Sequence, residues 1–145
     1  LGVVAAATIV ITVATLAVTA TVFNPKQWVA FAAVNLLVAA TYAMIGVIIG
    51  PLLGKVAGGV FVAFLIPFLD LGIIQSPMLR PEPEQWANLL PGYGWTKVLF
   101  DTGLTAHFDQ TGPLLAALAW LSGLLLVASL VLARSRRQGL NRVAG

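Results

Sequence analysis

Four long apolar stretches occupy most of this chain, at residues 1–22, 29–49, 56–74 and 113–133. Each is close to the ~20 residues with which an α-helix crosses about 30 Å of hydrocarbon. Lipid offers no hydrogen-bond partners to a backbone, so a crossing segment satisfies its amides and carbonyls within its own helix. The stretches therefore predict an all-α membrane protein with four transmembrane helices and a single transmembrane domain over residues 1–145.

Composition supports this class. Hydrophobic residues make up 59% of the chain and charged residues 9%, with a mean hydropathy of +0.97, whereas a soluble domain carries about 25% charged residues. A soluble protein with such stretches would expose large apolar patches to water. The chain has no cysteine, which excludes a disulfide framework and a thiolate metal site.

The distribution of charge predicts the orientation in the membrane. The chain begins at Leu1 within an apolar run and has no basic region before it, so we expect a piece of a longer protein rather than a signal peptide. The net charge of +3 arises mainly from arginines in the tail, residues 134–145. The positive-inside rule places this tail in the cytoplasm, and residues 75–112 then lie outside. These features predict a multi-pass protein of the plasma membrane.

The external segment contains two helical patterns. Residues 82–90 predict a short helix, and the Pro-Gly-Tyr-Gly sequence at 91–94 breaks it. The residues Trp95, Val98 and Leu99 then share one helical face. Such an amphipathic helix either lies along the membrane interface or enters the bundle. The aromatic residues Trp86, Tyr93 and Trp95 fit an interfacial position.

Polar residues within the first two spans have two interpretations. Thr8, Thr12, Thr15 and Thr19 lie on one face of the first predicted helix. They either form a polar path for a substrate or donate hydrogen bonds to carbonyls of the preceding turn. Asn35 and Tyr42 share a face of the second helix, which we expect to point at protein or water rather than lipid.

Asp70 is the one acidic residue within an apolar run, and Pro67 before it favours a kink. A charge inside a membrane is costly and marks a functional hypothesis by default. Asp70 lies only about one helical turn from the external end of its span. Pairing with Arg80 or Lys97, or a local pocket of water, is therefore an alternative to a role in transport.

No set of residues predicts an enzyme active site. His107 is the only histidine, and its position in a polar link favours a solvated surface residue. No second histidine supports a metal site, and no G-x-x-x-x-G-K-[ST] phosphate loop is present. The sequence therefore predicts no catalytic residue, no cofactor and no bound nucleic acid.

The order of elements resembles the C-terminal part of an ABC-2 type transporter permease. The residues that carry the likeness are Ala-Met-Ile-Gly-Val-Ile-Ile-Gly at 43–50, Pro-Phe-Leu-Asp-Leu-Gly-Ile-Ile-Gln-Ser-Pro-Met at 67–78 and Leu-Pro-Gly-Tyr-Gly at 90–94. They are similar to members that export drugs or lipids. In this family six spans form one half of a dimer, so the four spans here would match the third to the sixth, and residues 75–112 would hold external re-entrant helices.

The resemblance implies a permease subunit of an ATP-driven exporter. Its partners would be an ABC ATPase subunit, a second permease subunit and membrane lipid, and ATP hydrolysis would belong to the ATPase. The N-terminal interface helix and first cytoplasmic loop, which carry most ATPase contact in the family, have no counterpart in these residues, so this chain alone should not couple ATP hydrolysis to transport. A hydrophobic or amphipathic substrate would cross by alternating access, along the speculative pathway residues Thr8, Thr12, Thr15, Asn35, Tyr42 and Asp70. The residues Tyr93 and Trp95 would shape an external gate. Two alternatives are a secondary transporter driven by protons through Asp70 and a membrane assembly subunit that transports nothing.

Overall fold

A computed structural model describes residues 2–53, 64–76, 79 and 85–143, with only the backbone for residues 52 and 135–143. These residues contain no β-strand, as the all-α prediction requires. The elements in chain order are α1 (Gly2–Val22), α2 (Trp28–Ile49), η1 (Gly50–Leu53), η2 (Phe68–Ile74), η3 (Gln85–Leu89), α4 (Pro91–Leu104) and α5 (Thr111–Val143).

Three described helices are long and apolar enough to cross a membrane: Gly2–Val22, Trp28–Ile49 and Thr111–Arg134. They correspond to the predicted spans 1–22, 29–49 and 113–133. The remaining predicted span, 56–74, lies partly outside the described residues. Its described part is the shorter apolar helix Phe64–Ile74, so the structure supports three spans and leaves the fourth a prediction.

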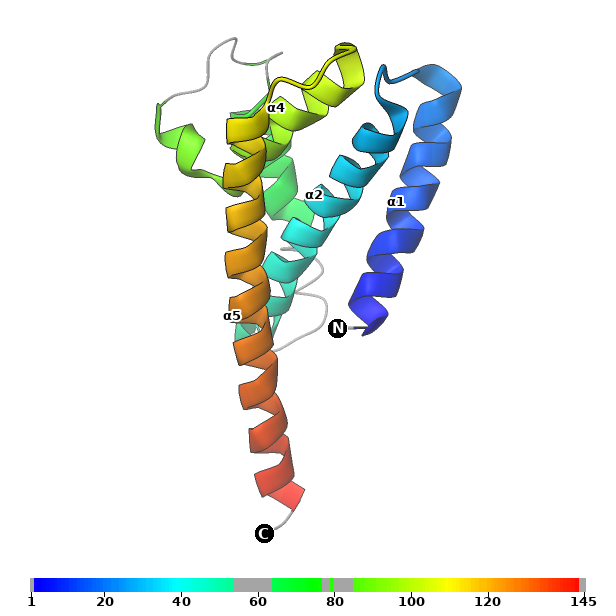
Figure 1. The fold of residues 1–145 in the computed structure, drawn as a ribbon. Helices are drawn as coiled ribbons and strands as arrows, with labels where there is room; N and C mark the ends of the chain where they lie inside the picture. Colours follow the sequence, from blue (N-terminus) through cyan, green and yellow to red (C-terminus); the bar gives the residue numbers. More distant parts are fainter. Residues whose placement is uncertain (1, 54–63, 77–78, 80–84, 144–145) are drawn as a thin grey trace.

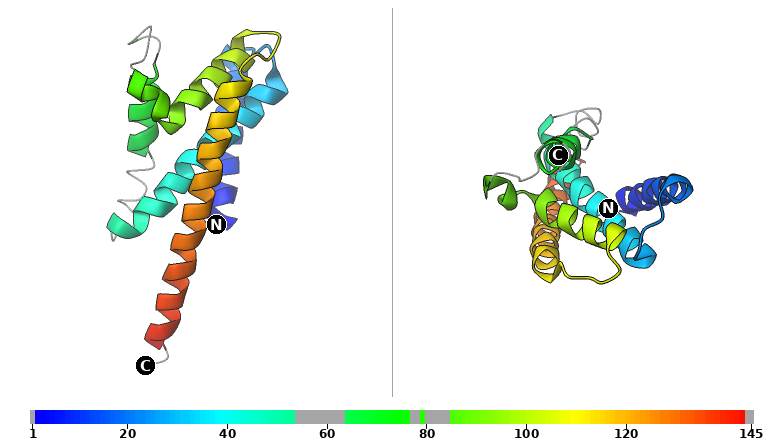
Figure 2. Two further views of the ribbon diagram at one scale, coloured as in Figure 1. Left: turned by 60° about the vertical axis from the view of Figure 1, so that its left-hand side comes forward. Right: turned by 90° about the horizontal axis from the view of Figure 1, so that it is seen from above.

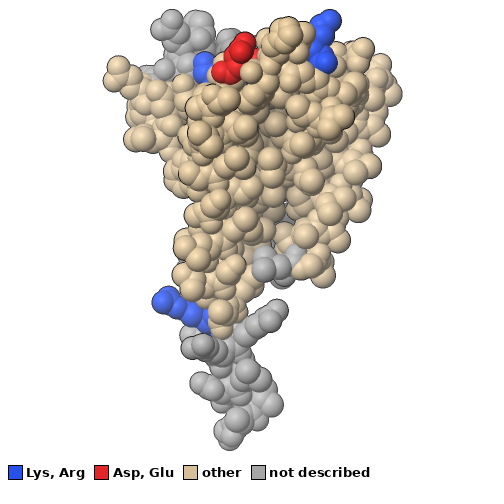
Figure 3. Space-filling model, viewed as in Figure 1, with Lys and Arg blue, Asp and Glu red and all other residues tan. Residues whose placement is uncertain are grey.

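The surfaces of the long helices are apolar. Only 6% of an 18-residue apolar stretch of α1 is buried within the protein. Side chains such as Val3 and Val10 are exposed. Figure 3 shows the charged side chains of this face at its two ends, with an uncharged surface between them. Exposed valine and leucine side chains over the length of a span indicate that hydrocarbon, rather than water, surrounds these helices. The chain is therefore a membrane protein.

The long helices form a bundle that is closed at one end by α4. α1 runs toward that end, α2 runs back, and α5 runs in the same direction as α2 and extends well beyond it (Figure 1). The 14-residue α4 is too short to cross a membrane, and it lies obliquely between the ends of α2 and α5 (Figures 1 and 2). We call this end of the bundle the α4 end.

The core lies where α2, α4 and α5 meet, and α1 packs on α2 outside it. α4 and α5 approach closely at Gly94, where a β-carbon would collide with the carbonyl oxygen of Pro113 and lie 2.9 Å from Cβ of Ala117. The buried residues of the core are Val34, Trp95, Val98, Ala117 and Leu121. The amphipathic pattern predicted around Trp95 is therefore confirmed, and it faces the bundle.

The predicted break at residues 91–94 is confirmed, because η3 ends at Leu89 and a new helix, α4, begins at Pro91. Proline suits this first position, where its missing N–H leaves no hydrogen bond unmade. Trp95 is completely buried and is not an interfacial aromatic residue, because its face of α4 is covered by α2 and α5. The helix predicted over 82–90 is a short 3₁₀ helix at Gln85–Leu89, and residues 82–84 lie outside the described part.

Candidate functional site

The carboxylate of Asp70 is the centre of a buried polar cluster at the α4 end. Asp70 is 4% exposed and lies in η2, a π-helical segment in which the N–H of Gln75 donates to the carbonyl oxygen of Asp70. π-Helical turns are rare and occur frequently at functional sites. The hydroxyl of Tyr42 on α2 donates to Oδ2 of Asp70 at 2.8 Å, which connects η2 to α2.

Asp70 also caps α4 from another part of the chain. The first N–H groups of a helix have no partner within the helix, and the N-cap residue Leu90 offers no side-chain hydrogen bond. The N–H of Gly92 donates instead to Oδ2 of Asp70 at 2.9 Å. Oδ2 of Asp70 therefore accepts hydrogen bonds from two donors, one of which is an N–H group that the start of α4 leaves without a partner.

Gly92 is required by the closeness of this contact. A β-carbon at Gly92 would lie 2.5 Å from Oδ1, 2.6 Å from Cγ and 2.7 Å from Oδ2 of Asp70. The other carboxylate oxygen, Oδ1, is buried and has no hydrogen-bond partner among the described residues. The carboxylate therefore packs closely against Gly92, and among the described residues Oδ2 accepts two hydrogen bonds and Oδ1 accepts none.

A hydrogen bond between two side chains connects α4 to α2, about one turn further along α4. Nε1 of the completely buried Trp95 donates to Oγ1 of Thr41 at 3.0 Å, and this hydroxyl in turn donates to the carbonyl oxygen of Leu37 at 2.8 Å. A buried indole N–H needs such an acceptor, because leaving it unpaired costs about 1–3 kcal/mol. Thr41 therefore holds α4 directly, and the adjacent Tyr42 holds it through Asp70.

The opposite end of α4 is held by the link between α1 and α2. The backbone N–H of Lys26 donates to the carbonyl oxygen of Gly103, and that of Gln27 to Thr102, both at 3.0 Å. These bonds satisfy carbonyls that a helix C-terminus leaves without partners. Asp101 is also buried and accepts the N–H of Asp109 at 2.9 Å. α4 is therefore anchored at both ends by groups outside itself.

The structure brings only some of the predicted site residues together. Tyr42 and Asp70 are hydrogen-bonded, and the predicted gate residues Tyr93 and Trp95 lie on the helix that Asp70 caps. The suggested pairing of Asp70 with Lys97 is not found: Nζ of Lys97 lies 5.8 Å from the ring centre of Tyr93. The other suggested partner, at position 80, lies outside the described residues.

Three threonines of the predicted stripe form hydrogen bonds within their own helix. Hydroxyls of Thr8, Thr15 and Thr19 donate to carbonyls four residues earlier, as the second interpretation of the stripe predicts. Thr12 is 6% exposed, and its hydroxyl has no hydrogen-bond partner among the described residues. Asn35 donates to the carbonyl oxygen of Phe31 and is not part of the Asp70 cluster.

Sequence reasoning missed Thr41, Gly92 and Gln75 as parts of the site. Gln75 is 3% exposed, and its Nε2 donates to the carbonyl oxygen of Ala87 on η3 at 2.8 Å. One available signal was the Pro-Gly pair at the start of α4, since glycine at a helix N-terminus permits close approach of another group. Nothing local identifies Thr41 or Gln75, because their partners come from distant parts of the chain.

The hydrogen bonds of the cluster connect three helical elements. Within the part of the chain that the structure describes, no three His, Cys, Asp or Glu side chains lie close enough to hold a metal ion. The donors to Asp70 are a phenol and a backbone amide, which fix the carboxylate in place. The site can therefore join η2, α2 and α4 at one end of a membrane bundle. Comparison of the chain with family models, with curated proteins and with solved structures finds no match.

Proposed function

We propose that this chain forms part of the permease subunit of an ATP-driven exporter of the ABC-2 type. The exporter would move a hydrophobic or amphipathic substrate, such as a drug or a lipid, out across the plasma membrane. The tail after Arg134 would lie in the cytoplasm, following the positive-inside rule, and the α4 end would then lie outside. The partners would be an ATPase subunit and a second permease subunit.

One observation supports this proposal more than any other. Two helices too short to cross the membrane lie at one end of the bundle, where α4 packs on α2 and α5, and η3 packs on α4. Buried polar groups hold both of them there. A segment of this kind is what the resemblance assigns to the external re-entrant helices of such permeases.

The proposed mechanism is alternating access. Closure of the ATPase dimer on ATP would open the permease dimer outward, and the substrate would leave along the interface between the permeases. Because Asp70 and Trp95 fasten α4 to its neighbours, α4 would move together with α2 and η2 as one gate. Tyr93 is half-buried beside this fastening, where it would contact the leaving substrate.

The test is ATP-driven transport by the complete reading frame that encodes this chain, coexpressed with a nucleotide-binding partner. Inside-out vesicles would be incubated in a medium that contains a panel of fluorescent amphipathic compounds and ATP. We expect accumulation that requires ATP and disappears when the catalytic glutamate of the partner is replaced. Absence of transport for every compound, together with no copurifying ATPase, would contradict the proposal.

The same vesicles distinguish the proton-driven alternative. Collapsing the proton gradient with an ionophore should leave transport by an ABC exporter unchanged, because ATP supplies the driving force. Asp70→Asn keeps the size of the side chain and removes its ability to carry a proton. Transport that stops both with the ionophore and in this variant, but continues without ATP, would favour a secondary transporter.

A further inference from the structure

An apolar cavity lies beside α4, on the side that faces the beginning of α2. Its volume is about 390 Å³, and it opens to the surface. The walls include Phe23 after α1, Phe31 and Asn35 on α2, and Thr96 and Leu104 on α4. This volume falls within the ~300–1,000 Å³ that is typical of small-molecule sites. No charged residue is among the described residues that line the cavity.

The position of the cavity along α2 corresponds to a depth close to the membrane surface at the α4 end. α2 begins at Trp28, and Asn35 lies seven residues further on, about 10 Å along the helix axis. Aromatic rings cluster at this level: the ring centres of Phe23 and Phe31 are 5.9 Å apart, and those of Trp28 and Phe31 are 6.2 Å apart. The indole of Trp28, which combines an apolar ring with a polar N–H, favours the boundary between headgroups and hydrocarbon.

The rim of the cavity is apolar and uncovered. Phe23 is 36% exposed, Phe100 46% and Leu104 59%, although all three line the cavity. Around a membrane-spanning helix, the medium at such a rim is hydrocarbon rather than water. The cavity therefore opens to lipid chains, which can enter it without leaving an apolar environment.

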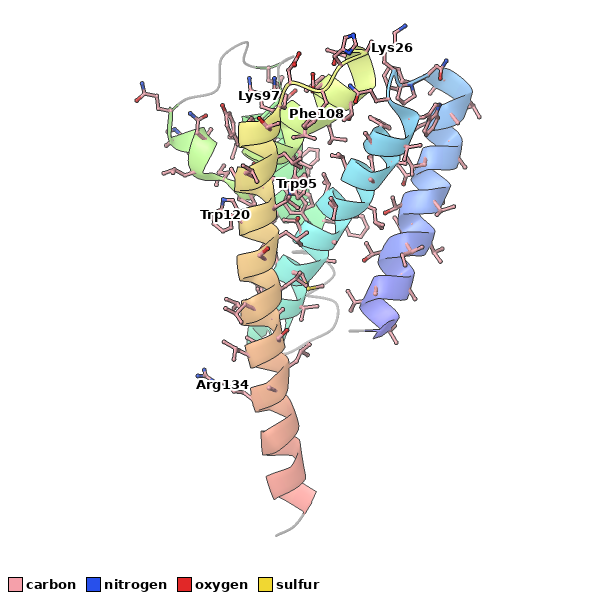
Figure 4. The ribbon with its side chains drawn as sticks, in the orientation of Figure 1. Lys26, Trp95, Lys97, Phe108, Trp120 and Arg134 are labelled. Carbon is pink, nitrogen blue, oxygen red and sulfur yellow. The ribbon has the colours of Figure 1, made fainter. Side chains whose placement is uncertain are left out.

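A lysine, Lys26, lies next to the opening of the cavity. The backbone N–H of Lys26 donates to the carbonyl oxygen of Gly103, which is itself part of the cavity wall. The side chain of Lys26 is exposed and projects at the tip of the link between α1 and α2 (Figure 4). The second lysine of the α4 end, Lys97, lies well away from Lys26 in the same view and is placed over the ring of Tyr93.

We propose that this cavity binds one anionic phospholipid, with an acyl chain between α2 and α4 and the headgroup phosphate beside Lys26. The occupant needs a long apolar part for the walls and a negative group at membrane-interface depth for the lysine. A phospholipid of the surrounding bilayer supplies both. This proposal depends on the membrane location alone and not on the proposed transport function.

The test is native mass spectrometry of the complete protein, purified in a mild detergent and titrated with lipid. The two probes are dioleoyl phosphatidylglycerol, which is anionic, and dioleoyl phosphatidylcholine, which has the same acyl chains and no net charge. We expect one tightly held phosphatidylglycerol per chain and an about fivefold preference over phosphatidylcholine, the effect of one lysine near an anionic lipid.

Two substitutions separate the cavity from the charge. Lys26→Gln should remove the preference for phosphatidylglycerol and leave the retained lipid in place. Thr96→Phe should fill the cavity and abolish retention of both lipids. Lys97→Gln is the matched control for the charge, because Lys97 is also an exposed lysine. Ser122→Phe is the matched control for the cavity, because Ser122 is a hydroxyl residue on the exposed face of α5. Both controls should bind lipid as the original chain does.

The outcomes decide the proposal without any measurement of transport. Equal retention of the two lipids by the original chain would overturn the charge contact, and unchanged retention in Thr96→Phe would overturn the cavity as the site. If Thr96→Phe does not give a monodisperse protein, Leu104→Trp fills the same cavity from its exposed rim, and it should also release the lipid. Retention by that variant equal to the original chain would contradict the proposal in the same way.

Discussion

Replacing Gly92 by alanine tests the contact on which the position of α4 depends. The new β-carbon would lie 2.5–2.7 Å from the three carboxylate atoms of Asp70, which is closer than real atoms approach, so the carboxylate must move. Its movement loses the hydrogen bond to the Gly92 N–H, worth about 1–3 kcal/mol. Displacing a buried side chain costs about 1–3 kcal/mol more.

Alanine is also the better helix former, by about 1 kcal/mol. The net effect is therefore a loss of about 3 kcal/mol in the free energy of unfolding, taking the middle of each range. For a chain of this size, about 2–4 °C of melting temperature corresponds to 1 kcal/mol. We expect Gly92→Ala to lower the melting temperature by roughly 6–12 °C, measured by tryptophan fluorescence of the complete protein in detergent.

Gly112→Ala is the matched control, because Gly112 is the second residue of α5 just as Gly92 is the second residue of α4. Its β-carbon would meet nothing within 4 Å, so the melting temperature should stay the same or rise slightly. A cycle with Asp70→Ala completes the argument. Removal of the carboxylate makes room for the β-carbon, so Gly92→Ala should cost little in that background. An equal loss with and without Asp70 would refute the reasoning.

Three further expectations follow from the geometry. Tyr42→Phe removes one of the two donors to the buried carboxylate and should lower the free energy of unfolding by about 1–3 kcal/mol, measured by denaturant titration. Trp95→Ala should cost about 3–5 kcal/mol in the same titration because the side chain is completely buried, whereas Trp120→Ala, at 43% exposure, should cost far less. Single cysteines at Lys26 and Arg134 should be labelled from opposite sides of the membrane by an impermeant maleimide, without background because the chain has no cysteine. Labelling of both from the same side would contradict the three spans predicted between them.

The long helices could be predicted because their cause is local. Burial in lipid depends on the summed hydrophobicity of about 20 consecutive residues, and α1, α2 and the apolar part of α5 begin and end within two residues of the predicted limits. The amphipathic face of α4 follows from spacing in the same way. The spacing does not predict what this face packs against, because an interfacial helix and a helix buried in a bundle have the same pattern. Only the packing of α4 on α2 and α5 distinguishes them.

The contacts of the candidate site could not be predicted from the spacing of residues in the sequence. The sequence alone marked Asp70 and Tyr42 as polar groups within apolar runs, for which lipid offers no partner. Which groups satisfy them depends on contacts between distant residues: Tyr42 and Asp70 are 28 positions apart, Asp70 and Gly92 are 22 apart, and Thr41 and Trp95 are 54 apart. Hydrophobicity is a property of each residue and adds along the chain, whereas a hydrogen bond requires two atoms to meet within about 3 Å. The sequence therefore determined that the chain enters a membrane as helices, and the tertiary structure alone decided that a buried carboxylate holds α4.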